Sequence, residues 1–369
     1  MDSQNITPMM RQYYRLKEET NGCILFFRLG DFYEMFDEDA HLVSRELNLT
    51  LTTRDRNAAS DEERTMMCGV PYHSAESYIA RLLNKGYKIA ISEQMEDPAT
   101  VKGLVAREIT RIVTPGTVTE PSMLEERRPN YIASVYIGGA ETTREGLAVC
   151  FCDVSTGETS AAKFAGDSAH ILNELVRYQP SELLLSADAA VDFNIKYFLS
   201  KNDRVLVQQP EEYFEIEACR SMCLRHFAAQ ANDAALFDPV VILAAGSLLG
   251  YLHTAQKNDL AHINSLSLYS SGQYMELDWQ TRRNLELTET LRGGEKRGSL
   301  LWALDKTKTS MGGRLLRSWI ERPLLSPTMI RRRLIAVDEL SRSDLARGEL
   351  TRLLKDVDDI ERLISRVVT

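Results

Sequence analysis

Cysteine and long apolar runs are both scarce in this sequence of 369 residues. The six cysteines, at positions 23, 68, 150, 152, 219 and 223, show no spacing that resembles a secreted disulfide framework. The longest apolar run, 240-VVILAAGSLLGYL-252, contains two glycines and is too short to span a bilayer. The N-terminus, MDSQNITPMM, lacks the basic start and apolar stretch of a secretory signal. We therefore expect a soluble, cytoplasmic protein with reduced thiols.

Signatures of ATP binding, hydrolysis and metal binding are also missing. The sequence has no Gly-x-x-x-x-Gly-Lys-Ser/Thr phosphate loop, and 293-GGEKRGSL-300 lacks both that order and a preceding apolar strand. His73 and His170 have no Ser or Cys in a recognisable nucleophile setting. Cys219, Cys223 and His226 could share one helix face, but a fourth zinc ligand is not apparent. We expect no cofactor, metal or catalytic residue in this chain.

Basic charge is in short supply over most of the sequence. The formal net charge is −9, from 44 basic and 53 acidic residues. Residues 1–120 carry a balance of −5 and residues 121–272 a balance of −8, whereas residues 273–369 carry +4. Only this last third has the basic excess of a surface for nucleic acid or an acidic partner, and solvated helix faces would explain it equally well.

The length predicts two or three domains, and the residue pattern changes twice along the chain. Residues 1–118 are mixed α/β, with the expected elements in the order helix 7–22, strand 23–29, turn and helix to 48, extended 49–54, polar loop to 63, helix 75–83 and strand 87–92. A linker is expected at 119–127, where Pro121 precedes the charged run 125-EERR-128.

A second α/β pattern follows the linker and then gives way to helices. Its expected elements are strands 131–137, 146–154 and 158–164, helix 168–178, strand 182–186, helix 191–200 and strand 204–208. Helices are expected at 218–229, at 239–257 and through most of 279–369, with an irregular stretch at 262–278. The pattern is still helical at Thr369 without a capping signal, which is typical of a truncated chain.

The stretch 29-LGDFYEMFDEDA-40 sets aromatics among acids directly after an apolar run. The ordinary interpretation is a strand–turn–helix unit with its aromatics packed inward and its acids near a helix N-terminus. A metal site is a second interpretation, because Asp31, Glu34 and Glu38 could hold Mg²⁺. Asp153, at the end of a central strand, would suit a metal-dependent nuclease, but Glu174 is its only evident companion, and a nuclease needs a larger ligand set.

An aromatic wedge is the third interpretation. Proteins that act through the DNA minor groove insert apolar side chains between base steps and kink the duplex. The cost is lowest where pairing is already defective, so a wedge senses deformability more than sequence. Phe32 would be such a wedge. Glu34 is unfavourable beside a polyanion unless it accepts a hydrogen bond from a base or takes up a proton, so one directed contact to the displaced base would explain it.

The run 30-GDFYEMF-36, with its Phe-x-Glu core, resembles the mismatch-recognition motif of the MutS family of DNA mismatch repair proteins. The likeness extends over nearly the whole chain in the family's order, through 50-TLTTRD-55, 67-MCGVPYHSAESYIARL-82, 93-EQMEDPATVKG-103, 109-ITRIVTPGT-117, 146-GLAVCFCDVSTGE-158, 276-ELDWQTRRNLEL-287 and 299-SLLWALDKTKTSMGGRLLRSWIERPLL-325.

This resemblance implies roles for particular residues. Phe32 would stack on the mispaired base and Glu34 would hydrogen-bond to it, whereas Tyr33 would face the protein. Four residues fall on matching segments near the family's DNA-facing surface and are candidate DNA contacts: Arg54, Met67, Tyr72 and His73. For Met67 and Tyr72, simple packing is an equally good explanation.

The resemblance also implies a multidomain fold and a set of partners. Residues 1–118 would form a mixed α/β mismatch-recognition domain, 128–250 a ribonuclease H-like α/β connector domain, and 251–369 the start of an all-α core, or lever, domain. Family members bind double-stranded DNA with mismatches or small loops, act as homodimers and signal to MutL, partly through the connector. Their ATP and Mg²⁺ bind in an ATPase domain that is absent from these 369 residues. Alternatively, the chain would dock a MutL-like partner without binding DNA productively.

Overall fold

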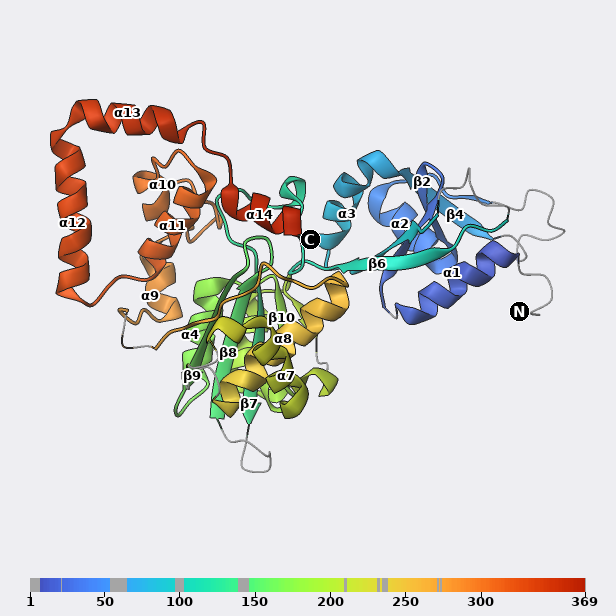
Figure 1. The fold of residues 1–369 in the computed structure, drawn as a ribbon, viewed down its shortest axis with the longest axis horizontal. Coiled ribbons are helices and arrows are strands. Elements are labelled where there is room, and N and C mark those ends of the chain that lie inside the picture. Colours follow the sequence, from blue (N-terminus) through green and yellow to red (C-terminus); the bar gives the residue numbers. More distant parts are fainter. Residues whose placement is uncertain are drawn as a thin grey trace. The chain divides into compact units, whose positions relative to one another are not determined.

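The computed structural model describes residues 7–20, 22–53, 65–96, 103–138, 146–208, 211–230, 233, 238–270, 272 and 274–368. The chain forms two compact units, and each contains a β-sheet with helices against it (Figure 1). Met1–Val118 and Leu252–Asp259 make the first unit, and Thr119–Tyr251 and Leu260–Thr369 make the second.

The first unit is built on a sheet whose described strands number six, in the order β3-β4-β2-β1-β5-β6. β1 and β5 are parallel, and all other neighbours are antiparallel. The strands are β1 (Ile24–Leu29), β2 (Phe32–Phe36), β3 (Thr52–Thr53), β4 (Met66–Pro71), β5 (Ile89–Gln94) and β6 (Arg107–Val113). The helices are α1 (Pro8–Glu19), α2 (Asp37–Leu47) and α3 (Ala75–Leu83).

Side-chain alternation along β1 builds the core of this unit on both faces of the sheet. Leu25 and Phe27 point to the face that α1 covers, where the Tyr13 and Phe27 rings meet edge to face at 5.5 Å. Phe26 lies on the opposite face and is also fully buried. A strand that is buried on both faces carries apolar residues at successive positions, which explains the continuous apolar run 23-CILFF-27.

The prediction of a turn and helix after residue 29 was wrong for residues 32–36. They form β2, which pairs antiparallel with β1 through a two-residue loop, Gly30-Asp31. Gly30 has a φ of +58°, and glycine at the first loop position is what a type II′ hairpin requires. β4 was also not predicted, because its alternation is interrupted by Gly69 and ends in Pro71.

The second unit is built on another sheet with six described strands, in the order β11-β10-β7-β8-β9-β12. β7, β8 and β9 are an antiparallel meander, and β10 and β11 continue the sheet in parallel with β7, as in a ribonuclease H-like fold. The strands are β7 (Tyr131–Gly138), β8 (Gly146–Asp153), β9 (Glu158–Phe164), β10 (Glu182–Leu185), β11 (Leu206–Gln208) and β12 (Ser267–Leu268). The last of these lies in the stretch expected to be irregular.

Helices cover both faces of this second sheet (Figure 1). One face packs on α4 (Ala169–Tyr178), α5 (Ala187–Val191) and α6 (Phe193–Lys201), where Phe151 and Tyr178 stack at 3.7 Å. The other face meets α7 (Ile216–His226) and α8 (Pro239–Gln256), and Ser134 of β7 shares a 2.7 Å hydrogen bond with Ser247 of α8.

The helix α8 is the one apolar helix of the described chain that could cross a membrane by length and composition. It has 18 residues and confirms the helix predicted at 239–257. Of its apolar window, 72% is buried inside the protein, which is the behaviour of a core helix.

The remaining described segments are mainly helical, as predicted. They are α9 (Trp279–Asn284), α10 (Leu300–Leu304), α11 (Ser310–Glu321), α12 (Pro327–Arg342), α13 (Asp344–Leu354) and α14 (Ile360–Val368). Residues 285–299 lack a helix. The predicted fold class, two mixed α/β domains followed by helices, is confirmed.

Candidate nucleic-acid interface

Phe32 and Glu34 share one face of β2, because side chains two apart along a strand point the same way. Phe32 is 45% exposed although it is a large apolar side chain in a regular strand. Glu34 is half-buried beside it. Phe36 continues the same face but is buried against α1, where its ring meets Tyr13 at 4.9 Å. The strand therefore buries one end of this face and leaves Phe32 open at the other.

Gly69 of β4 lies directly opposite Glu34. A Cβ atom at Gly69 would stand 3.5 Å from Cγ of Glu34 and 3.7 Å from Cδ1 of Phe32. The missing side chain therefore leaves room beside both residues. Sequence reasoning missed Gly69, although a lone glycine in a strand often marks a close approach of backbone or ligand.

Tyr33 points to the other face of β2 and is buried, as the resemblance implied. Its hydroxyl donates a short hydrogen bond to the carboxylate of Glu93 on β5. Burial, followed by this hydrogen bond and the charge of Glu93, raises the pKa of Tyr33 to about 12. Tyr33 is therefore a neutral anchor below the exposed Phe32.

Arg28 supports the tip of the hairpin. Its Nε donates a 2.5 Å hydrogen bond to the carbonyl of Gly30, and its Nη1 lies 3.8 Å from the carboxylate of Glu93. The guanidinium carbon lies 3.8 Å from the ring centroid of Tyr72, which is a cation–π contact. The backbone N–H of Tyr72 also bonds to the carbonyl of Asp31 at 2.9 Å.

The candidate DNA contacts differ in exposure. Tyr72 is 46% exposed and His73, which meets it edge to face at 5.8 Å, is also exposed. Met67 is half-buried and packs against the core cluster of α1. Arg54 lies outside the described residues. Tyr72 and His73 therefore lie next to the hairpin tip, whereas Met67 also has a packing role.

Comparison with known proteins decides the family. Three family models match in order: MutS domain I at residues 7–122, MutS domain II at 130–264 and MutS domain III at 280–369. The chain is 48% identical over 98% of its length to the DNA mismatch repair protein MutS of Ruminiclostridium cellulolyticum, and 46% identical over 99% to that of Acetivibrio thermocellus. The same protein of Symbiobacterium thermophilum is 45% identical over 100%. The chain belongs to the MutS family.

The chain spans about two-fifths of the length of the curated MutS relatives that it matches, 41% for the first two and 42% for the third. The matched MutS domains and the two compact units divide the chain at different residues. The domain limits expected from the sequence therefore stay predictions.

One acid of the stretch 29–40 serves the fold of this MutS domain I. Asp39, which sequence reasoning did not single out, is buried and accepts hydrogen bonds from Lys17 at 2.7 Å and from the N–H of Leu25 at 3.0 Å. Within the described residues, no group of three His, Cys, Asp or Glu side chains could hold a metal ion. The interpretation of Asp31, Glu34 and Glu38 as a Mg²⁺ site gains no support.

The nuclease candidates of MutS domain II have other partners. Asp153 is fully buried, its Oδ1 accepts from the hydroxyl of Ser155 at 2.6 Å, and its Oδ2 accepts from the N–H of Asn130 at 3.0 Å. Glu174 instead accepts from Tyr269 at 2.7 Å and pairs with Arg177. Both carboxylates are committed to the packing of the domain.

The cysteines are all free thiols, and all six are buried. Cys219 and Cys223, the zinc candidates with His226, lie on α7. Burial raises the pKa of each thiol to about 12, so both are protonated at neutral pH. Among the described residues, no group of three His, Cys, Asp or Glu side chains is placed to hold a metal ion, so the zinc interpretation gains no support.

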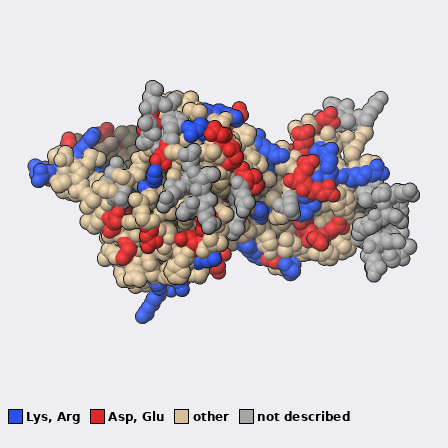
Figure 2. All heavy atoms as spheres, turned by 90° about the horizontal axis from the view of Figure 1, so that it is seen from below, with Lys and Arg blue, Asp and Glu red and all other residues tan. Residues whose placement is uncertain are grey.

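Acidic and basic side chains are interspersed over the visible face in Figure 2. A surface that binds DNA through its phosphates would present a continuous field, or patch, of Lys and Arg side chains. The visible face shows no such continuous field.

Replacing Tyr33 with phenylalanine will loosen the hairpin without unfolding it. The change removes the hydroxyl bond to Glu93 and keeps the ring, so we expect a loss of about 1 kcal/mol of local stability. Hydrogen exchange followed by mass spectrometry should show faster exchange in peptides from β1 and β2. Tyr72→Phe is the matched control, because Tyr72 contributes its ring to Arg28; equal acceleration in both variants would contradict the anchoring role.

Proposed function

We propose that this chain recognises mispaired or unpaired bases in double-stranded DNA by inserting Phe32 as a wedge from the minor groove. The relatives it resembles are DNA mismatch repair proteins, which supports mismatch recognition as the general function. The observation that carries the finer proposal is the exposed Phe32 ring, which stands on a rigid hairpin rather than on a loop.

The surroundings of Phe32 suit a wedge. An intercalating side chain must resist being pushed back, and Phe32 stands on a strand paired on both sides, to β1 and to β4. Beneath it, Tyr33 and Arg28 tie the hairpin to Glu93. Unstacking a base step costs a few kcal/mol, and this cost is lowest at a defective pair. A rigid wedge would therefore enter preferentially at mismatches and kink the duplex there.

Glu34 would supply one directed contact to the displaced base. It shares the face of Phe32, and Gly69 opposite leaves space beside both side chains. A half-buried carboxylate next to DNA is unfavourable unless a base donates a hydrogen bond to it. Tyr72 and His73 would contact the duplex next to the wedge. Arg54, in the segment after β3, would also contact the duplex. Met67 would contribute at most an apolar contact.

The proposal extends to partners that MutS relatives imply. Residues 119–250 would dock a MutL-type protein, and the whole protein would act as a cytoplasmic, nucleoid-associated homodimer. ATP and Mg²⁺ would bind in regions of the relatives beyond the matched segment, so this chain would need no cofactor and would catalyse no reaction.

Fluorescence anisotropy at low salt tests the proposal directly. One labelled duplex carries a single unpaired thymine, and its control is fully paired. Because residues 1–272 are acidic and most affinity for DNA comes from Lys and Arg at phosphates, we expect weak binding overall and several-fold tighter binding of the defective duplex. Equal affinity for both duplexes, with binding measurable, would refute recognition by this chain.

A further inference from the structure

The second unit contains a cavity of about 560 Å³ between α4, α6, α9 and the segment 287–291. Small-molecule sites in proteins are clefts or cavities of roughly 300 to 1,000 Å³ lined by aromatic side chains and a few placed polar groups. The cavity has that size, and its lining combines aromatic with cationic side chains.

One part of the lining is aromatic. Tyr197 of α6 and Trp279 of α9 are half-buried, and their ring centroids lie 5.7 Å apart with a 54° tilt. Phe198 and Leu172 are buried beside them. Two tilted, partly open rings offer a surface on which a flat ring can pack.

The other part of the lining is cationic. Four basic side chains line the cavity, and only two acidic ones do. The basic residues are Arg177, Lys201, Arg282 and Arg283, and the acidic ones are Glu289 and Glu321. Both acids already face another cation, because Arg317 lies 3.0 Å from Glu321 and 3.5 Å from Glu289. Arg177 is in turn paired with Glu174, which lies outside the lining, so with Arg317 and Glu174 both counted the site keeps a formal surplus of two positive charges.

Arg177 supplies the observation that points to a ligand. It is only 8% exposed, its Nη1 donates to Glu174 at 2.9 Å, and its guanidinium packs over Tyr178 and Tyr269. Its Nε is buried, and the described part of the chain provides no hydrogen-bond acceptor for it. A buried donor left without an acceptor costs about 1 to 3 kcal/mol, and more when it is charged.

Arg282 lies in the same electrostatic environment. Burial lowers its pKa, and the nearby charge of Arg177 lowers it further. Its Nη1 donates a 2.8 Å hydrogen bond to the backbone carbonyl of Glu321. This uncharged acceptor holds the Arg282 side chain in place but does not neutralise its positive charge. An anion that enters the cavity would relieve the repulsion between these two guanidinium groups.

We propose that this cavity binds a nucleoside monophosphate, with its base against Tyr197 and Trp279 and its phosphate toward Arg177 and Arg283. A phosphate monoester carries close to two negative charges at neutral pH, which matches the surplus of the lining. Arginine donates in a planar fork that suits phosphate oxygens. The source would be a free nucleotide or the 5′-phosphorylated end of a nucleic-acid strand, which present the same chemistry. This inference does not depend on the wedge proposed for Phe32.

Titration calorimetry of the full chain with adenosine 5′-monophosphate tests the site. We expect saturable binding in the micromolar to low millimolar range, with adenosine and inorganic phosphate each at least tenfold weaker. Quenching of tryptophan emission on binding should disappear in Trp279→Phe. Arg177→Met should abolish binding; since that residue also packs in the core, Arg283→Ala, which alters an exposed side chain, should weaken binding at least threefold.

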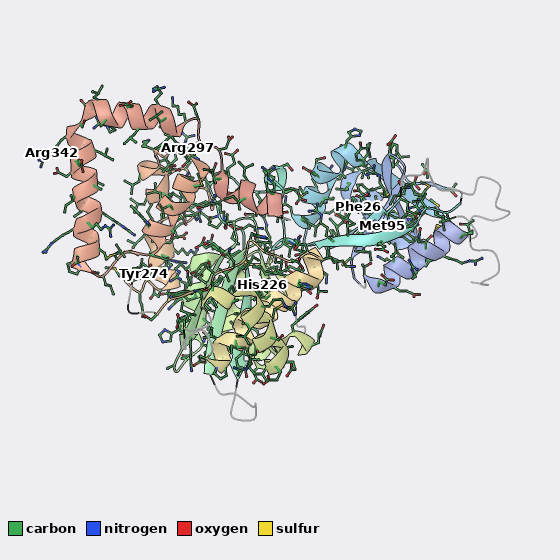
Figure 3. All side chains as sticks on the ribbon, in the orientation of Figure 1. Phe26, Met95, His226, Tyr274, Arg297 and Arg342 are labelled. Carbon is green, nitrogen blue, oxygen red and sulfur yellow. The ribbon has the colours of Figure 1, made fainter. Side chains whose placement is uncertain are left out.

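Arg297→Ala is the matched control, since Arg297 is an exposed arginine of the same unit that does not line the cavity (Figure 3). Its binding should equal that of the unaltered chain. A competing arm uses a 5′-phosphorylated oligodeoxynucleotide: displacement of the monophosphate assigns strand ends as ligands, and failure to displace it assigns the free nucleotide. No saturable binding of the monophosphate, or equal weakening by Arg283→Ala and Arg297→Ala, would overturn the proposal.

Discussion

Replacing Arg362 with alanine will lower the free energy of unfolding of the second unit by about 3 to 5 kcal/mol, the cost of breaking a buried ionic network from one side. Its guanidinium donates to the hydroxyl of Ser155 at 3.1 Å and to the backbone carbonyls of Glu125 and Arg128 at 3.0 and 2.9 Å. The substitution would remove this donor from all three acceptors and would remove the positive charge that faces the buried Asp153.

The measurement is a urea unfolding curve followed by tryptophan emission. All three tryptophans, at 279, 302 and 319, belong to the second unit, so the signal reports on that unit alone. Arg366→Ala is the matched control, because Arg366 lies one helical turn later on α14 and is exposed. We expect it to change stability by less than about 0.5 kcal/mol. Similar losses in both variants would show that Arg362 contributes only as a surface residue of the helix.

The pH dependence of the stability loss is a second test of the role of Arg362. Burial raises the pKa of Asp153 above its usual range, so its folded form holds the proton more tightly than the unfolded chain. Stability linked to that proton is present at low pH and is lost as the pH rises through the folded pKa. Without Arg362 the charged carboxylate is less well compensated, so the loss in Arg362→Ala should be largest at pH 7 and should shrink as the pH falls toward the folded pKa of Asp153.

Local signals predicted elements well where the signal and the element occupy the same few residues. Thr7 accepts a hydrogen bond from the N–H of Met10, and Pro8 is the first helical residue, as the sequence indicated for the first helix. The helix ends at Glu19 rather than at residue 22, because ends depend on fraying and caps. The strands β7 to β10 were predicted for the same reason: their apolar runs are long and bounded by turn residues.

Pairing partners distant in sequence could not be predicted. β2 and β4 exist because each hydrogen-bonds to the other, and β12 exists because Ser267 and Leu268 pair with β9. Such short strands have no periodicity of their own, so only the sheet selects them. The same limit applies to the candidate site. The motif indicated Phe32 and Glu34, but the bond from Tyr33 to Glu93 joins residues 60 apart.

Replacing Phe32 with alanine will abolish the preference for a duplex with an unpaired thymine while leaving the first unit folded. Stacking between a base and an aromatic ring contributes about 1 to 3 kcal/mol, which is enough to account for the whole several-fold preference, so affinity for the defective duplex should fall to that for the paired duplex. Affinity for the paired duplex should hardly change, because a wedge contributes little where the base stack is intact. The ring is nearly half exposed, so its loss removes little packing.

The neighbouring aromatic residues make the test specific. Phe36→Ala truncates a side chain on the same face of β2, but this side chain is buried, so the substitution leaves a cavity. We expect it to lower the free energy of unfolding by about 3 to 5 kcal/mol. Tyr33→Phe changes the opposite face and should keep the preference for the unpaired base. Phe32→Leu retains an apolar side chain without a ring, so it should restore part of the preference if filling the gap matters and none if stacking alone matters. Preference for the defective duplex that survives in Phe32→Ala would refute the wedge, because the hairpin offers no second exposed aromatic on that face among the described residues.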